Sequence, residues 1–104
     1  MHYVLLASHT PESCPTSNAT IRELMQKIGP EVPGIAERTG VKFVSGPFTN
    51  REHILVVVVE AQTGESVDRF LDESRLAHWN SVRVLPSVPL EESVKELDKH
   101  APIF

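Results

Sequence analysis

The sequence predicts a single α+β domain over residues 1–104, built on a four-stranded antiparallel sheet. Two observations lead to this prediction. Segments with strand-type and helix-type apolar spacing follow one another in the order strand, helix, strand, strand, helix, strand, and a last helix follows. The length of 104 residues also suits one domain, which at this size buries roughly two thirds of its unfolded surface without help from a metal or a disulfide.

The first half of the chain predicts a strand, a loop and a broken helix. Residues 2–9 read as a strand, and the two prolines in residues 10–17 indicate a loop. A helix follows to about residue 28, and Gly29-Pro30 should break it. A second helical piece covers about 31–39 and ends at Gly40. The apolar positions with helical spacing are Ile21, Leu24, Met25, Ile28, Val32, Ile35 and Ala36.

The second half predicts a hairpin, a helix, a strand and a final helix. Strands are expected at 41–45 and 53–61, separated by a turn region at 46–52. A helix begins near Thr63-Gly64, and residues 81–85 form the last strand, which Pro86 ends. Pro89 suits the first turn of a last helix, with Val94 and Leu97 expected to face inward.

This order of elements is the ferredoxin-like βαββαβ pattern with an added C-terminal helix. Right-handed crossovers then give the strand order 4-1-3-2 with antiparallel neighbours throughout. A sheet covered by helices on one face should alternate apolar and polar residues, but two strands here are apolar on both faces. These are Tyr3-Val4-Leu5-Leu6-Ala7 and Ile54-Leu55-Val56-Val57-Val58-Val59. We therefore expect the second face to pack against another copy of the chain in a two-fold homodimer.

With this element order and these two-sided strands, the chain resembles the dimeric α/β-barrel superfamily. That superfamily includes cofactor-free monooxygenases, haem-handling enzymes and small isomerases, so the resemblance implies a fold and a dimer rather than one activity. The segment His9-Thr-Pro-Glu-Ser-Cys-Pro-Thr-Ser-Asn18 is similar to that of a group of small prokaryotic proteins within it.

Composition and charge exclude several classes of partner. The formal net charge is −4 without a cluster of Lys or Arg, which argues against nucleic-acid binding. The longest apolar run, Ile54 to Val59, is far too short to cross a membrane. Cys14 is the single cysteine, so no intramolecular disulfide can form. With no signal-peptide pattern at the N-terminus, the expectation is a reducing, cytoplasmic setting.

The predicted topology brings four chemically active residues to one end of the sheet. Because neighbouring strands run in opposite directions, the end of the first strand lies beside the starts of the third and fourth. His9 ends the first strand, His53 begins the third and His78 precedes the fourth, while Cys14 lies in the loop that leaves the first strand. Imidazole and thiolate are ligands that suit Zn, Cu, Ni or Fe. The sequence therefore predicts a transition-metal site made by His9, His53, His78 and Cys14.

Other readings of these residues remain open. The histidines could line a metal-free polar pocket, or they could simply be solvated at strand ends. Cys14 precedes a helix and could be a nucleophilic or redox thiol, or a small buried apolar residue. Candidate pocket residues are Trp79 and Phe48 as apolar walls, Arg51 as a clamp for an anion and Tyr3 as a phenol donor; ordinary packing or solvent exposure is the competing reading for each.

Three functions follow from these readings. The first is a small homodimeric metal-binding protein, either a metalloenzyme or not, with a His-rich site at the sheet end. The second is a cofactor-free enzyme, a small-molecule monooxygenase or isomerase, in which His9 or His53 is the general base. The third is a non-enzymatic module that binds a small molecule or a partner protein.

Overall fold

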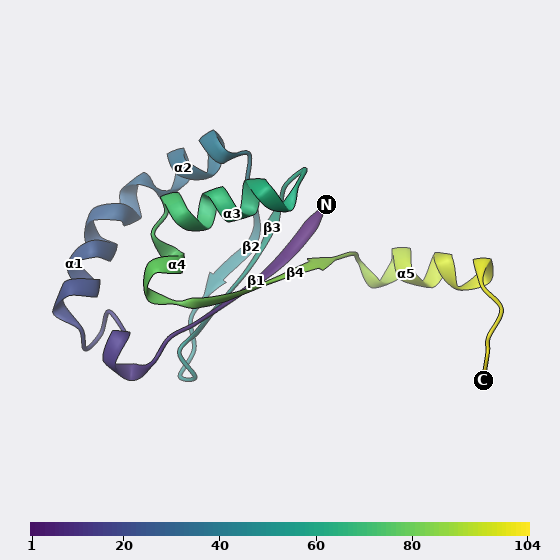
Figure 1. Ribbon diagram of the computed structural model, residues 1–104, viewed down its shortest axis with the longest axis horizontal. Helices are drawn as coiled ribbons and strands as arrows, with labels where there is room; N and C mark the ends of the chain where they lie inside the picture. The colour runs from purple at the N-terminus through teal and green to yellow at the C-terminus, as the bar shows by residue number, and fades with distance from the viewer.

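Four antiparallel strands form an open sheet in the order β2-β3-β1-β4 in the computed structural model, which describes residues 1–104 (Figure 1). Read from the other edge, this order is 4-1-3-2. The strands are β1 (His2–Ser8), β2 (Lys42–Phe48), β3 (Ile54–Glu60) and β4 (Ser81–Ser87). The α+β class and the antiparallel sheet predicted from the sequence are therefore confirmed.

Helices cover one face of this sheet (Figure 1). They are α1 (Ala19–Ile28), α2 (Val32–Thr39), α3 (Gly64–Glu73) and α4 (Leu76–Trp79), and α5 (Leu90–Glu96) follows the last strand. Short 3-10 turns lie at Pro11–Ser13, Gly29–Glu31 and Leu97–Lys99. The break expected at Gly29-Pro30 is the 3-10 turn between α1 and α2, and Gly40 ends α2 with a left-handed φ of 79°. No helix has both the length and the apolar character needed to cross a membrane.

The core lies between the sheet and these helices. Alternate residues of β1 (Tyr3, Leu5 and Ala7) point to the helical face and are at most 4% exposed. They pack in one apolar cluster with residues of α2 and α3 such as Ile35 and Phe70. Tyr3, predicted as a pocket residue, is thus part of the core, because the regular alternation of β1 turns it toward the helices.

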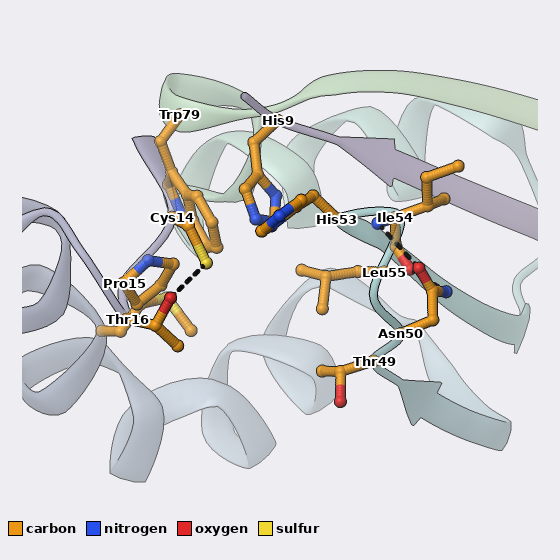
Figure 2. Close-up of a pocket in the computed structure, with 11 residues that line it drawn as sticks. His9, Cys14, Pro15, Thr16, Thr49, Asn50, His53, Ile54, Leu55 and Trp79 are labelled. Carbon is orange, nitrogen blue, oxygen red and sulfur yellow. Dashed lines mark hydrogen bonds between the residues drawn. The ribbon is translucent and has the colours of Figure 1, made fainter. Parts of the chain in front are cut away.

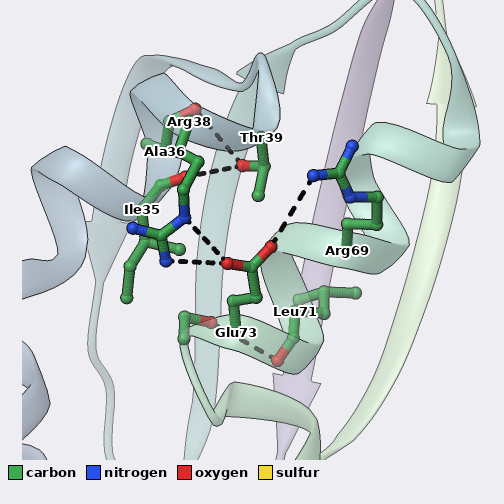
Figure 3. A network of polar contacts seen from close by, with 8 residues as sticks. Ile35, Ala36, Arg38, Thr39, Arg69, Leu71 and Glu73 are labelled. Carbon is green, nitrogen blue, oxygen red and sulfur yellow. Dashed lines mark hydrogen bonds and ion pairs between the residues drawn. The ribbon is translucent and has the colours of Figure 1, made fainter.

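A polar contact joins helices α2 and α3 (Figure 3). Arg38 of α2 donates two hydrogen bonds to Oε1 of Glu73 in α3, from Nε at 2.9 Å and from Nη2 at 2.7 Å. Arg69 lies one helical turn before Glu73, with its Nη2 3.9 Å from Oε2. Because the arginines are mostly exposed, we expect this network to contribute no more than about 1 kcal/mol per pair.

The opposite face of the sheet carries no helix. Strand register places Val4 and Leu6 of β1 there, next to Val58 and Val56 of β3, and Leu85 of β4 faces the same side. All five side chains are only partly buried, and none belongs to the core cluster. We call this set of residues (Val4, Leu6, Val56, Val58 and Leu85) the open face.

The C-terminal segment projects away from the domain (Figure 1). Val94 and Leu97 were expected to face inward, but they are 53% and 68% exposed, so that prediction was wrong. The reason lies in Val88-Pro89: a residue before proline favours an extended backbone, and Pro89 itself is extended, so the chain continues outward from β4. The radius of gyration is accordingly 16.3 Å, against about 13 Å for a compact chain of this length.

Candidate metal centre

His9 lies directly after β1, and its neighbours fix both its position and the tautomer of its neutral ring. Its backbone N–H donates to the carbonyl of His53 (3.1 Å). Asn80 donates through Nδ2 to the carbonyl of Leu76 (3.1 Å), which leaves Asn80 Oδ1 as the acceptor for Nδ1 of His9 at 2.9 Å. In the neutral imidazole, Nδ1 therefore carries the proton and Nε2 keeps a free lone pair. That Nε2 atom is buried and has no hydrogen-bond partner.

His53 is held by the turn between β2 and β3. Its φ of 58° lies in the left-handed region, which an ordinary residue enters only when its surroundings require it. Asn50 imposes the turn: its Oδ1 accepts from the backbone N–H groups of Glu52 (3.1 Å) and Ile54 (3.2 Å), and its Nδ2 donates to the carbonyl of Ile54 (2.7 Å). The result places the His53 ring edge-on to that of His9, with centroids 5.4 Å apart.

Cys14 lies in a loop whose backbone carbonyls are bound by nearby side chains. Arg22 of α1 donates to the carbonyls of Pro15 (2.8 Å) and Thr16 (2.6 Å). Asn18 caps α1 by accepting from the N–H of Ile21 (3.0 Å) and also donates to the carbonyl of Glu12 (2.9 Å). Ser17 Oγ donates to the carbonyl of Pro11. The loop is thus fixed by helix α1 before any ligand is present.

Hydrogen bonds around Cys14 favour its thiolate form. They lower the pKa of Cys14 from its ordinary value of 9.0 to about 6. The largest cause is the hydroxyl of Thr16, which lies 3.0 Å from the sulfur, followed by the Thr16 backbone N–H, and burial opposes the shift. A thiolate is the form in which cysteine binds metals or attacks electrophiles.

These three side chains form one group of potential ligands. One donor atom each from His9, Cys14 and His53 lies within 4.8 Å of the other two (Figure 2). Zn–N and Zn–S bonds of about 2.0–2.3 Å require donor separations of roughly 3.3–3.8 Å, so small side-chain movements would suffice to coordinate one ion. The unpartnered Nε2 of His9 is the kind of buried lone pair that a metal ion satisfies.

A cavity of about 390 Å³ opens next to the group. His9, Cys14 and His53 form part of its wall, and the other lining residues are Pro15, Thr16, Met25, Thr49, Asn50, Ile54, Leu55 and Trp79 (Figure 2). No carboxylate, lysine or arginine is among them, so the cavity suits a small, uncharged molecule. Trp79 packs against His9, with ring centroids 5.0 Å apart, and its indole Nε1 is a second buried polar atom without a partner.

The structure does not bring every predicted residue to this site. His78 is exposed and is not part of the group, because successive residues of the one-turn helix α4 point about 100° apart and Trp79 occupies the inward position. Phe48 is 57% exposed, and Arg51 is exposed in the same turn region; neither lines the cavity. Trp79 is the one predicted pocket residue that does.

Several residues that shape the site were not singled out from the sequence as positioning residues. Asn80 orients His9, Thr16 binds the sulfur of Cys14, and Asn50 shapes the turn before β3. The sequence offered one signal for Asn80: it directly precedes β4, and the start of β4 lies at the same end of the sheet as His9. Met25 was read only as part of an amphipathic helix, yet it also lines the cavity.

Comparisons with protein-family models, with curated proteins and with solved structures found no match. The chemistry of this site is therefore argued from its own residues. What these residues offer is two imidazoles, one thiol and an adjoining apolar cavity.

Proposed function

We propose that this protein is a small homodimeric transition-metal-binding protein in which each chain holds one ion through His9, Cys14 and His53. The observation that carries the proposal is the buried, unpartnered Nε2 of His9, one of three donor atoms gathered within 4.8 Å. Asn80 supports it as well, because ligating histidines commonly donate their other ring N–H to a neighbouring oxygen that fixes the ring.

The donor set narrows the choice of metal. Two imidazoles and a thiolate favour Zn or Cu, with Ni and Fe as weaker candidates, over the hard ions Mg and Ca. Met25 lines the same cavity, and a thioether next to a His₂Cys set is the environment in which proteins commonly hold copper. Three protein ligands are one fewer than a closed tetrahedral site uses, so a bound ion would keep a position for water or for a small molecule from the cavity.

Such an ion would act as a Lewis acid or as a redox centre beside an apolar cavity. The chain's own residues have simpler roles. Asn80 holds the neutral His9 ring in the tautomer that leaves Nε2 free, Thr16 stabilises the sulfur of Cys14 as thiolate, and Trp79 and Leu55 line the cavity with apolar surface.

The experiment is metal binding by the purified full-length chain. We expect one equivalent of Zn²⁺ or Cu²⁺ per chain, measured by elemental analysis and titration calorimetry, and a rise in melting temperature on binding. Cys14→Ser, His9→Gln and His53→Gln should each weaken binding by at least tenfold. Asn80→Ala should weaken it by roughly 10–100-fold through the orientation of His9.

His78→Gln is the matched control, since His78 lies in the adjacent helix but is exposed. It should bind metal as the unchanged chain does. If no metal among Zn, Cu, Ni and Fe binds at one equivalent per chain or raises the melting temperature, the proposal is wrong. An equal loss with His78→Gln would mean that the ligand set is wrong.

A second candidate is a metal-free enzyme with the same residues. The fixed tautomer of His9 favours it, because an unprotonated Nε2 at the cavity wall can accept a proton from a bound molecule as general base. Metal-free activity would persist in the presence of a chelator and would be lost in His9→Gln. Metal-dependent activity would be lost both on addition of a chelator and in His9→Gln.

A further inference from the structure

The exposed apolar side chains of this protein fall into two separate regions. One is the C-terminal arm, residues 88–104, which contributes Val88, Leu90, Val94, Leu97, Ile103 and Phe104, each at least 53% exposed. The other is the edge strand β2, where Val44 is 50% and Phe48 is 57% exposed. Only Met1 among the large exposed apolar side chains belongs to neither region.

The arm makes almost no contact with its own domain. Helix α5 has substantial contact only with the 3-10 turn that continues it, and it extends beyond the end of β4 (Figure 1). An isolated helix of seven residues is not stable in water, since helices below about 12 residues are marginal alone. Leu90, Val94 and Leu97 are spaced four and three residues apart and so form one apolar stripe. The helix thus needs a surface that its own domain does not offer.

The direction of the arm favours another molecule over a return to the same domain. Pro89 has an extended backbone (φ −57°, ψ 144°), and Val88 before it favours an extended backbone too, so no turn back toward the sheet forms at this point. β4 and β2 are the two opposite edges of the sheet. The arm therefore starts at the edge of the sheet opposite to β2 and extends away from its own domain (Figure 1).

Charge also matches the arm to the edge strand. The arm carries Glu91, Glu92, Glu96 and Asp98 against Lys95 and Lys99. Lys42 at the start of β2 is exposed and takes part in no ion pair. An acidic helix with an apolar stripe fits this edge, where Lys42 is two residues from Val44 and Phe48 lies at the other end of the strand.

We infer that the C-terminal arm of each chain docks on the β2 edge of a second copy, so that a two-fold dimer exchanges arms. The inference builds on the proposed homodimer and names the segment that holds the two subunits together. In such an isologous pair the same contact occurs twice, which matches one arm and one exposed β2 edge per chain. The apolar stripe then lies on Val44 and Phe48 of the partner, while Lys42 of the partner faces the glutamates.

Photo-crosslinking tests where the arm binds. A benzophenone side chain replaces Val94 in the full-length chain, and equal amounts of ¹⁴N- and ¹⁵N-labelled chains are mixed before irradiation. We expect mixed-isotope crosslinks from the arm to the tryptic peptide Phe43–Arg51, which contains Val44 and Phe48. Crosslinks confined to a single isotope would place the arm on its own domain and would overturn the inference.

Sedimentation equilibrium tests how much the arm contributes. The unchanged chain should have a mass of twice 11.6 kDa, about 23 kDa. The full-length variant Leu90→Glu/Val94→Glu/Leu97→Glu should dimerise roughly a hundredfold more weakly or not at all. Ser93→Glu is the matched control on the same helix, and it should leave the dimer intact. A dimer of unchanged affinity in the triple variant would overturn the inference.

These outcomes separate the arm from the other proposals. A chain that is monomeric at every concentration would remove both the dimer and the arm exchange. If the triple variant dimerises with unchanged affinity, only the inference about the arm is wrong, and the proposed dimer stands. The triple variant should still bind metal as the unchanged chain does, because the arm leaves β4 at the sheet end opposite to His9.

Discussion

The state of Cys14 depends on one hydroxyl. Thr16 Oγ1 lies 3.0 Å from the sulfur and is the largest cause of the lowered pKa. In metal-free protein, half of the thiol should ionise near pH 6 when folded, against about pH 9 when unfolded. The folded state then binds fewer protons between these values, so Cys14 stabilises it at pH 9 and above, and this contribution is lost as the pH falls through 6.

Thr16→Val should raise this ionisation midpoint. The substitution keeps the shape of the side chain but removes the hydroxyl, while the Thr16 backbone N–H continues to favour the thiolate. The expected midpoint therefore lies between 6 and 9. Because Cys14 is the only cysteine, thiolate absorbance or the rate of iodoacetamide alkylation against pH reports on it alone. An unchanged midpoint would contradict the role given to Thr16.

Three of the four residues that the sequence predicted as ligands lie within ligand distance of one another. Antiparallel strand direction was enough to predict that His9, Cys14 and His53 meet. Strand direction did not predict the orientation of His78. In a single helical turn, packing decides which residue faces inward, and Trp79 has the larger apolar side chain to bury. The role of Asn80 needed coordinates, because an amide can bond to many partners that sequence does not distinguish.

At the scale of elements, the cysteine loop and helix α1 form one unit. Asn18 ends the loop, caps the helix and binds the carbonyl of Glu12. Helix α3 has a similar cap in Thr63, which accepts from the N–H of Ser66 (3.2 Å) but has no contact with the metal centre. The two caps therefore form a natural pair for comparison.

Asn18→Ala and Thr63→Ala should each lower the free energy of unfolding by about 1 kcal/mol, the usual value of a lost N-cap. Only Asn18→Ala should also weaken metal binding, because it releases the loop that carries Cys14. Chemical denaturation and metal titration of both variants measure the two effects. Equal metal affinities in the two variants would show that the loop does not need its cap.

The ends of the helices and strands could be predicted wherever the sequence has clear helix-breaking or capping residues. Gly29-Pro30 and Gly40 marked the breaks that the structure has, and Thr63 marked the start of α3. Three elements differ from the prediction, and one of them is β4, which does not end at Pro86 but continues to Ser87, because an edge strand tolerates a proline. α4 is a single turn, too short to show a period, and β2 continues through Gly46-Pro47 to Phe48 because Gly46, with a φ of 85°, allows the strand to bulge.

At the scale of the whole molecule, two apolar surfaces, the open face and the arm, are not covered by any other element of the chain. The apolar alternation of β1 and β3 predicted the first from sequence, since both faces of those strands are apolar. The second could not be predicted in the same way: an amphipathic C-terminal helix looks alike whether it packs on its own domain or on another. Only its direction after Pro89 distinguishes the two cases.

Val58→Glu tests the open face. A carboxylate in the middle of this surface should prevent the proposed dimer, because burying it without a partner is unfavourable by several kcal/mol. Light scattering should then give a mass of 11.6 kDa. Gln26→Glu adds the same charge to the exposed surface of α1 and should leave the dimer unchanged. A dimer that tolerates Val58→Glu would place the interface elsewhere.

His2 pairs with Ser87 at one end of the sheet, and Ser8 pairs with Ser81 at the other, roughly 20 Å away by strand geometry. The group of His9, Cys14 and His53 and the start of the C-terminal arm therefore lie at opposite ends of the domain. If the protein is immobilised through Phe104, its cavity should face the solution. A bulky fusion partner at Phe104 should hinder the proposed dimer but leave the cavity accessible to ligands.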